Sequence, residues 1–242
     1  MKTEQILTVR GVLESTTLLN AITEEQMVHL AGVSKMDFAA KSEPIWINHR
    51  DVGFIGLVGN GFVKMAKSTS AGTDVTLEIM GPGQPFGLLG VIDGLGCPLM
   101  AYALTDLDYL KIPKSAILDI YNKNHVLKDR LLRKTALRMH QKLNFIGKLT
   151  SCRADERLAA VLFILADSYG RNDGEAIRLQ LPLTRQLIGE MAGTTTETTI
   201  RIFSRWTQEG VLETENQRIT ILNPLELESK LDGGSDDFRG KL

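Results

Sequence analysis

Residues 183–206 read LTRQLIGEMAGTTTETTIRIFSRW, and this stretch predicts two short helices joined by a tight turn. Gly193 stands between them, where the first helix must end in a residue that tolerates positive φ. Thr194 and Thr195, which follow it, are good N-cap residues, and the spacing of Thr194 and Glu197 matches a capping box, which indicates the start of the second helix. The apolar positions follow helical periodicity: Leu187, Ile188 and Met191 in the first helix, then Ile200, Ile202, Phe203 and Trp206 in the second. This is the pattern of a helix-turn-helix.

The outward face of the second helix is crowded with hydrogen-bonding groups, namely Thr195, Thr196, Glu197, Thr198 and Arg201. An arginine can donate two hydrogen bonds to guanine O6 and N7, and a glutamate can accept one from cytosine N4. Glu197 and Arg201 are four residues apart, so they can also form an ion pair that restricts the arginine rotamer. A plain helical hairpin is the alternative, but these polar groups favour a DNA-reading helix.

Composition places the chain among soluble globular proteins. It has 242 residues, 43% of them hydrophobic and 24% charged, which suffices for two modest domains with their own cores. No apolar run is long enough for a membrane span, and residues 1–5 lack the apolar stretch of a signal peptide, so we expect a cytoplasmic protein. The net charge of −1 disfavours a nonspecific nucleic-acid coat protein, so any DNA affinity must come from a few placed groups.

The two cysteines, Cys97 and Cys152, lie far apart in the sequence. Their separation indicates neither a disulfide framework nor a metal-binding motif. We expect each to be a buried or half-buried thiol; a redox role is the alternative.

Residues 36–113 have the sequence pattern of a β-domain. Short, nearly alternating runs are separated by glycine turns, which is typical of a jelly roll or sandwich; the predicted strands are 45–47, 54–58, 62–65, 75–80, 99–104 and 108–112. Before this domain, Thr23 and Gln26 have capping-box spacing and predict a helix from about residue 24 to 34.

A long helix is predicted over 126–150, and one side of it carries a heptad seam. The seam residues step by alternating intervals of four and three: Leu132, Ala136, Met139, Leu143, Ile146 and Thr150. The seam is narrow and charged residues flank it, so we favour a parallel coiled coil between two copies of the chain. The alternative is a helix buried against its own sheet.

The remaining segments predict a winged DNA-binding domain. A helix over about 155–169 and a strand over 176–182 precede the helix-turn-helix, and a hairpin of 211–213 with 218–222 follows it. We therefore expect an α+β chain: a jelly-roll domain at 1–115, a dimerisation helix at 116–150, a winged helix-turn-helix at 151–228 and a disordered tail at 229–242.

This order of domains resembles the cyclic-AMP receptor protein/FNR family of bacterial transcription regulators. The resemblance spans roughly 30–225, and its most specific part is the run from Leu183 to Arg201; Gly61 and the 83–90 run GQPFGLLG match more loosely. It implies a homodimeric, sequence-specific regulator that binds a near-palindromic operator, contacts RNA polymerase and senses an effector through a cyclic-nucleotide-binding-like jelly roll. An effector would act by shifting a hinge near 151–154.

Carried over by position, the resemblance assigns base reading to Glu197, Arg201 and Thr196. It assigns phosphate contacts to Thr184, Arg185, Thr195 and Thr198. Thr196 stands where the cyclic-AMP branch has an arginine that reads a further guanine, which favours half-sites of the TTGA type over TGTGA. Ile200 departs from both branches and leaves the base sequence open.

The predicted sensor departs from the cyclic-nucleotide pattern. Leu88 stands where that branch has a ribose-binding glutamate, and Cys97-Pro98 stand where it has an Arg-Ser pair for the phosphate. An apolar side chain cannot accept from a ribose hydroxyl, so we do not expect cyclic AMP to bind in the usual mode. The iron–sulfur cluster of the FNR branch needs four cysteines, which this chain lacks.

Three other possibilities stay open, and the sequence names no cofactor or effector. A small apolar or aromatic ligand would suit a pocket of Leu88, Leu89, Leu99, Met100 and Tyr102, although a filled core would give the same pattern. A haem gas sensor could use one of His29, His49, His125 and His140 as axial ligand. A metal-dependent jelly-roll enzyme needs several histidines on facing strands, and only His49 lies in the strand region, so we do not expect an enzyme.

Overall fold

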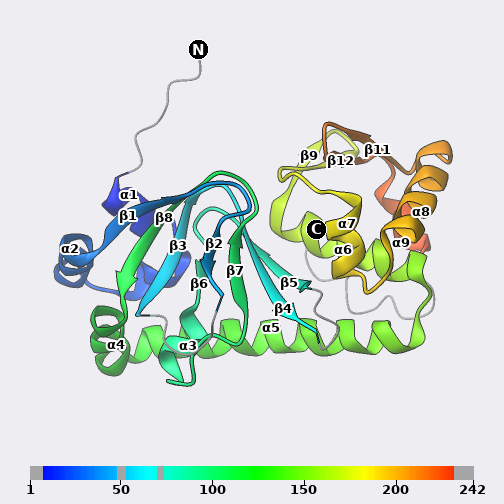
Figure 1. Cartoon of the computed structure of the whole chain (residues 1–242). Helices are drawn as coiled ribbons and strands as arrows, with labels where there is room; N and C mark the ends of the chain where they lie inside the picture. Colours follow the sequence, from blue (N-terminus) through cyan, green and yellow to red (C-terminus); the bar gives the residue numbers. More distant parts are fainter. Residues whose placement is uncertain (1–7, 48–52, 70–73, 232–242) are drawn as a thin grey trace, which may run out of the picture. The chain divides into compact units, whose positions relative to one another are not determined.

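The protein is described here from a computed structural model, which covers residues 8–47, 53–69 and 74–231. The chain divides into two compact units, Met1–Arg138 and Met139–Leu242. Figure 1 labels the helices and strands. His49 lies outside the described residues, as does most of the tail predicted to be disordered.

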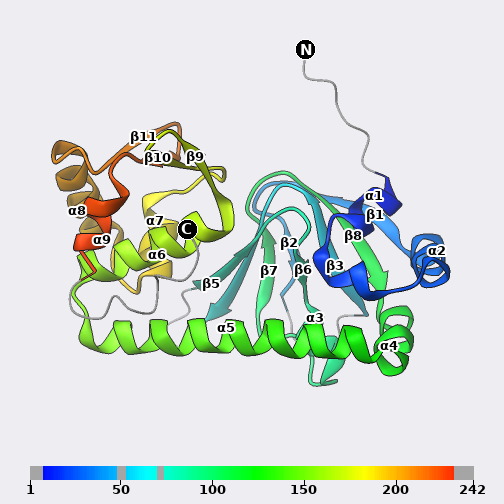
Figure 2. The same ribbon diagram turned by 180° about the vertical axis from the view of Figure 1, so that it is seen from behind.

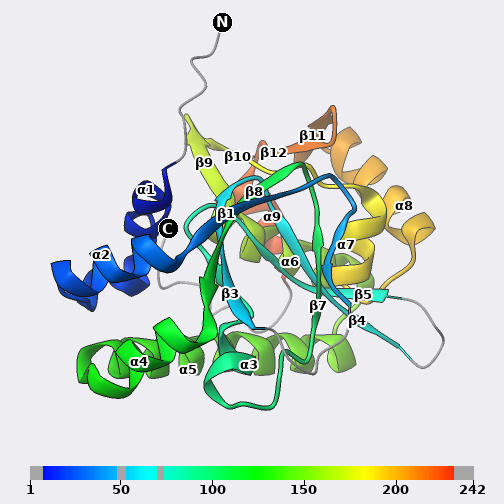
Figure 3. The same ribbon diagram turned by 60° about the vertical axis from the view of Figure 1, so that its left-hand side comes forward.

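The first unit contains two antiparallel four-stranded sheets, which is the predicted jelly-roll domain. One sheet has the order β1-β8-β3-β6 and the other β2-β7-β4-β5 (Figures 1 and 3). The strands are β1 (Lys35–Ala39), β2 (Pro44–Trp46), β3 (Phe54–Asn60), β4 (Val63–Ser68), β5 (Asp74–Met80), β6 (Pro85–Phe86), β7 (Met100–Ala103) and β8 (Leu107–Pro113). All six predicted strands are present; the sequence analysis missed β1 and the two-residue β6.

Helices cover the outer face of the β3–β8 pair (Figure 2). They are α1 (Val9–Glu14), the 3-10 helix Thr17–Ala21, α2 (Glu24–Val33), α3 (Leu88–Ile92) and α4 (Lys114–Lys123). Leu13, Leu30, Leu57 and Leu110 are fully buried in the apolar layer between these helices and the strands. The capping box at Thr23 and Gln26 is present, as predicted.

Helix α5 (His125–Ser151) follows α4 after a break at Asn124, whose side-chain oxygen accepts from the backbone N–H of Leu127 at 3.0 Å. Its predicted seam faces solvent: Leu132, Met139 and Leu143 are 69%, 59% and 56% exposed. Leu132 belongs to the first unit, so its exposure argues against the alternative interpretation, in which the seam is buried against that unit's own sheet. Leu127 and Leu131 are the buried residues of α5, and they pack on the helical layer of the first unit.

The second unit is a winged helix-turn-helix. Its elements after α5 are α6 (Ala154–Tyr169), β9 (Gly170–Asp173), β10 (Ala176–Leu179), α7 (Arg185–Met191), α8 (Thr196–Gln208), β11 (Leu212–Glu215), β12 (Arg218–Ile221) and α9 (Pro224–Ser229). The strands form one antiparallel sheet of order β11-β12-β10-β9, in which β11 and β12 are the predicted hairpin. The sequence analysis missed β9 and α9.

Candidate DNA-binding interface

Helices α7 and α8 form the predicted helix-turn-helix, with Gly193 in the turn at φ +60°. Of the two predicted N-cap residues, Thr195 caps α8 and Thr194 does not. The backbone N–H of Thr194 donates to the carbonyl of Gly189 at 2.9 Å, so Thr194 still belongs to the turn that closes α7. Thr195 is the N-cap, and its hydroxyl accepts from the backbone N–H of Thr198 at 3.2 Å. The capping box of Thr194 and Glu197 is therefore wrong by one residue.

The two helices approach each other most closely at Gly189. A Cβ on this buried glycine would lie 2.8 Å from the hydroxyl oxygen of Thr199 and 3.2 Å from the carbonyl oxygen of Thr194. Thr199 is fully buried, and its hydroxyl donates to the carbonyl of Thr195 at 2.9 Å. A glycine in the interior of a short helix is the sequence signal for this contact, and the sequence analysis did not use it.

The buried face of α8 consists of Thr199, Ile202, Phe203 and Trp206. Ile200 was predicted to belong to this face, but it is 48% exposed. It follows Glu197 by three residues and precedes Ser204 by four, so helical geometry places it on the solvent side. The assignment of Ile200 to the core is wrong, and an apolar group instead stands among the outward polar ones.

Glu197 and Arg201 are both exposed on α8, one helical turn apart. The pKa of the Glu197 carboxyl is lowered by its own backbone N–H and by the Thr195 hydroxyl, so the group is ionised at neutral pH. The anticipated ion pair between Glu197 and Arg201 is not formed. Among the described residues, Arg201 has no hydrogen bond or ion pair, so all its N–H donors remain available.

Three of the predicted phosphate contacts are threonines at helix starts. Thr184 caps α7 by accepting from the backbone N–H of Leu187 at 3.1 Å. The Thr195 hydroxyl lies 3.2 Å from that of Thr198. The Thr195 hydroxyl is the donor of that bond, so the Thr184 and Thr198 hydroxyls keep a proton for a phosphate, and helix starts attract anions. Thr196, the first residue of α8, is partly buried.

Arg185, the fourth predicted phosphate contact, has partners within the unit. Its guanidinium lies over the Phe203 ring, 4.1 Å from the centroid, and donates to the Thr214 hydroxyl of β11 at 2.9 Å. Burial lowers the pKa of this side chain. Arg185 therefore joins α7, α8 and the wing hairpin, a positioning role that the sequence analysis missed.

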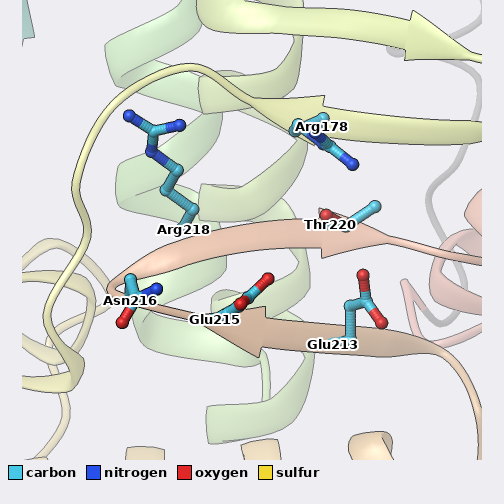
Figure 4. A pocket seen from close by; sticks show the side chains of 6 residues that line it. All are labelled: Arg178, Glu213, Glu215, Asn216, Arg218 and Thr220. Atoms are coloured by element: carbon cyan, nitrogen blue, oxygen red, sulfur yellow. The ribbon is translucent and has the colours of Figure 1, made fainter.

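The outer face of the wing sheet holds a polar depression (Figure 4). Arg178, Arg218, Glu213 and Glu215 line it together with Asn216 and Thr220. Two guanidinium groups are balanced by two carboxylates, so this face offers no net positive charge to a phosphate backbone.

The five residues predicted to line an effector pocket do not come together. Leu88 packs on the outer helical layer, Leu99 packs on the core between the sheets, and Leu89 is 50% exposed. Ala101 and Ala103 of β7 point into the core, so the alternating Met100 and Tyr102 face the other side of the sheet.

Aromatic side chains fill the space between the two sheets. Phe86 is 1% exposed, its ring stacks on Trp46 at 5.3 Å, and it leaves no room for a Cβ on Gly56. Tyr109 and Cys97 complete this part of the core, and burial raises the pKa of the Cys97 thiol. A protonated, buried thiol is unreactive.

Neither a haem ligand nor a metal centre is evident in the part of the chain that the structure describes. His29, His125 and His140 are all exposed, so none lies in an apolar pocket of the kind that surrounds an axial haem ligand. Across residues 8–47, 53–69 and 74–231, no three or more histidine, cysteine or acidic side chains gather at a common point. No helix in these ranges is long and apolar enough to cross a membrane.

Two family models match the chain. The cyclic nucleotide-binding domain matches residues 36–124, and the Crp-like helix-turn-helix domain matches residues 156–230. The chain belongs to the Crp/FNR family. A member of this family carries an N-terminal β-rich domain, a long helix and a C-terminal helix-turn-helix, and the present fold has all three.

Curated relatives of this Crp/FNR chain are transcription regulators. It is 26% identical over 208 residues to the transcriptional activator protein anr of Pseudomonas aeruginosa, covering 86% of this chain and 85% of the relative. It is 25% identical over 165 residues to the CRP-like cAMP-activated global transcriptional regulator of Mycobacterium tuberculosis, covering 68% and 74%. The solved structure of FixK2 from Bradyrhizobium japonicum has the same fold, with a TM-score of 0.74 at 23% identity, covering 84% and 99%. The chain is thus a Crp/FNR-type transcription regulator with a helix-turn-helix DNA-binding domain.

Proposed function

We propose that this regulator binds DNA as a homodimer and reads bases through Glu197 and Arg201 of α8, with Thr196 beside them. The observation that carries the proposal is the exposure of an ionised carboxylate and an unpartnered guanidinium one turn apart near the start of the recognition helix. Unpaired polar groups on a protein surface cost little in water, and they are free to pair with base edges in the major groove.

The homodimer rests on the exposed seam of α5. Leu132, Met139, Leu143 and Ile146 are 56–69% exposed, and they repeat at coiled-coil intervals. Pairing two copies along this seam removes the apolar side chains from water. A two-fold dimer presents two recognition helices to half-sites about one helical turn of DNA apart, roughly 34–36 Å, which implies a near-palindromic operator.

The proposed backbone contacts come from Thr184, Thr195 and Thr198, each near the start of a helix. The Arg185 guanidinium has further N–H donors besides those that face Phe203 and Thr214. These can donate to a phosphate while the side chain keeps its orientation. With threonine at position 196, we propose half-sites of the TTGA type. RNA polymerase is the partner that the family resemblance implies.

We also propose that cyclic AMP is not the effector. The described core between the sheets is filled by Phe86, Trp46 and Tyr109, and Leu88 lies in the outer helical layer. The relative from M. tuberculosis is named as cAMP-activated, so the two proteins are expected to differ in this response. The exposure of the described histidines gives a haem sensor no support, and we propose no enzymatic activity.

Selection of bound sequences from a random DNA pool tests the proposal, using purified full-length protein without added nucleotide. The expected product is an inverted repeat whose half-sites resemble TTGA. Repeating the selection with cyclic AMP is expected to give the same motif at the same affinity. Enrichment of no motif, or of a motif without two-fold symmetry, would refute the dimeric DNA-reading function. Binding only in the presence of cyclic AMP would refute the effector proposal alone.

A further inference from the structure

Arg157, in the first turns of α6, connects two segments of the second unit that are far apart in sequence. Its Nε donates to the carbonyl of Ala192 at 2.8 Å, and one terminal nitrogen donates to the carbonyl of Gly193 at 3.1 Å. The other terminal nitrogen donates to the carbonyl of Cys152 at 2.9 Å. One guanidinium thus joins the turn of the helix-turn-helix to the residue directly after α5.

The charges make this bridge stronger than three ordinary hydrogen bonds. Ala192 is the C-cap of α7, and Cys152 directly follows the last residue of α5, so both carbonyls lie at helix C-termini. Unpaired carbonyls and the helix dipole make a helix C-terminus electronegative, and a cation there is stabilising. The planar arginine fork meets two such ends at once.

Two further contacts support the same connection. The Gly193 backbone lies against Leu149 in the last turn of α5, where a Cβ on Gly193 would lie 3.0 Å from Leu149 Cδ2. Within the same unit, Arg205 of α8 donates to the Asp155 carboxylate at 3.1 Å, which joins the recognition helix to α6. The segment between α5 and α6 is only two residues long, Cys152 and Arg153, and both the Arg157 bridge and the Gly193–Leu149 contact span it.

We propose that Arg157 is a positioning residue that fixes the helix-turn-helix relative to the C-terminal half of α5, and so sets the half-site spacing that the dimer accepts. The inference rests on the proposed homodimeric DNA binding. The seam of α5 would define the two-fold axis, α8 would define where each half-site lies, and the Arg157 bridge connects the two. Loss of the bridge frees the two-residue segment, so one dimer can match several spacings.

The experiment measures affinity for a series of operators in which the spacer between selected half-sites is shortened or lengthened by one or two base pairs. For wild type, each such change is expected to lower affinity about tenfold or more, because the second half-site rotates away from the fixed helix. R157M is expected to lose less than about threefold across the series while keeping the same base preferences within each half-site. R171M is the matched control, since Arg171 lies on exposed β9, outside the segment between α5 and α6 and outside the helix-turn-helix. Its spacer dependence is expected to match wild type.

The outcomes separate this inference from the proposed function. A helix-turn-helix that is merely destabilised would bind every spacer more weakly by the same factor, which would overturn the positioning role. Unchanged spacer dependence in R157M would also overturn it. Should R157M fail to fold, R157K replaces it, because lysine keeps the charge but lacks the planar fork; spacer dependence like that of wild type in R157K would then overturn the inference. Wild-type protein without sequence-specific binding would instead refute the proposed function.

Discussion

The two units of this chain differ in whether their polar side chains have partners within the fold. In the β-domain, aromatic rings fill the core, and the Tyr109 hydroxyl at its margin donates to the Asp37 carboxylate at 3.0 Å. In the helix-turn-helix, the core is equally closed around Phe203 and Trp206. On its surface, however, Arg201 has no partner among the described residues, and the exposed Glu197 carboxylate interacts only with its own backbone N–H and the Thr195 hydroxyl. Folding stability favours satisfied groups, whereas recognition needs donors and acceptors left for a partner. The DNA-binding unit carries available donors and acceptors on the exposed face of α8. The described interior of the β-domain has none of the charges that a cyclic nucleotide requires.

Truncation of the aromatic core tests how tightly the interior of the β-domain is packed. It is expected to change the free energy of unfolding more than any other substitution proposed. Phe86→Ala is expected to lower the free energy of unfolding by about 3–5 kcal/mol, because the ring is buried and little can collapse into its place. Denaturant unfolding of the full chain measures this. Leu89→Ala, at a side chain that is 50% exposed, is the control and should change stability by less than about 0.5 kcal/mol. A loss of under about 1 kcal/mol for Phe86→Ala would mean that the interior is loosely packed, against the present account.

Disruption of the α5 seam tests whether the two copies of α8 in a dimer bind the operator together. Leu143→Glu is expected to leave the monomer folded, since the side chain is 56% exposed, but to abolish dimerisation. Operator affinity should then fall by about 100-fold or more, because the second half-site no longer benefits from a linked partner. Sedimentation measures the assembly state and fluorescence titration the affinity. Gln141→Glu adds the same charge at an exposed position away from the seam, and it should stay dimeric. A Leu143→Glu protein that remains dimeric would place the interface elsewhere.

Removal of the unpartnered guanidinium tests the recognition surface itself. Arg201→Ala is expected to cost about 1–3 kcal/mol of binding free energy per half-site without loss of stability, because the side chain is exposed and has no partner in the described unit. Competition titration against the selected operator measures this cost. Arg171→Ala, on exposed β9, removes the same charge away from α8 and serves as control. Equal losses in both variants would indicate general charge attraction in place of base reading.

The ion-paired Asp37 carboxylate of the β-domain is expected to make the smallest contribution to the free energy of unfolding. An ion pair with Lys111, and donation from Tyr109, lower the pKa of Asp37 below its ordinary value of 3.8. A lowered folded-state pKa contributes stability above pH 3.8, and this contribution is lost as pH falls through the folded-state value. Because the pair is partly exposed, the contribution is under about 1 kcal/mol. Unfolding measured from pH 6 to pH 3 should therefore show a slightly shallower acid destabilisation in Asp37→Asn than in wild type; a steeper one would contradict the assignment.

Most of the correct predictions rest on patterns formed by residues close together in the sequence. The turn at Gly193 and the helical periodicity of α5 and α6 depend on residues close in the chain, and each was correctly placed. The coiled-coil seam on α5 stays a prediction. Thr194 and Thr195 were both predicted as N-cap residues of α8 because they offer the same chemistry, and only the capping box at Thr194 and Glu197 was wrong. Backbone hydrogen bonding within the turn decides between them, and no side chain encodes it.

The contacts that the sequence did not predict connect distant segments. Arg157 bonds to backbone carbonyls, one of them 35 residues away, and a carbonyl is present at every position of the chain. The stacking of Arg185 on Phe203 likewise depends on how α7 crosses α8. The five residues predicted to line an effector pocket lie in different layers. Leu88 packs on the outer helical layer, Leu99 packs on the core between the sheets, and Met100 and Tyr102 lie on the opposite face of β7, and this layering depends on contacts between distant segments.

A double-mutant cycle between protein and DNA tests whether Arg201 reads a base. Wild type and Arg201→Ala are each titrated with the selected operator and with one in which the guanine assigned to Arg201 is replaced in both half-sites. We expect a coupling free energy of about 1–3 kcal/mol per half-site, so that the base change costs the variant almost nothing. Additive losses, with coupling below about 0.5 kcal/mol at every guanine tested, would contradict base reading by Arg201.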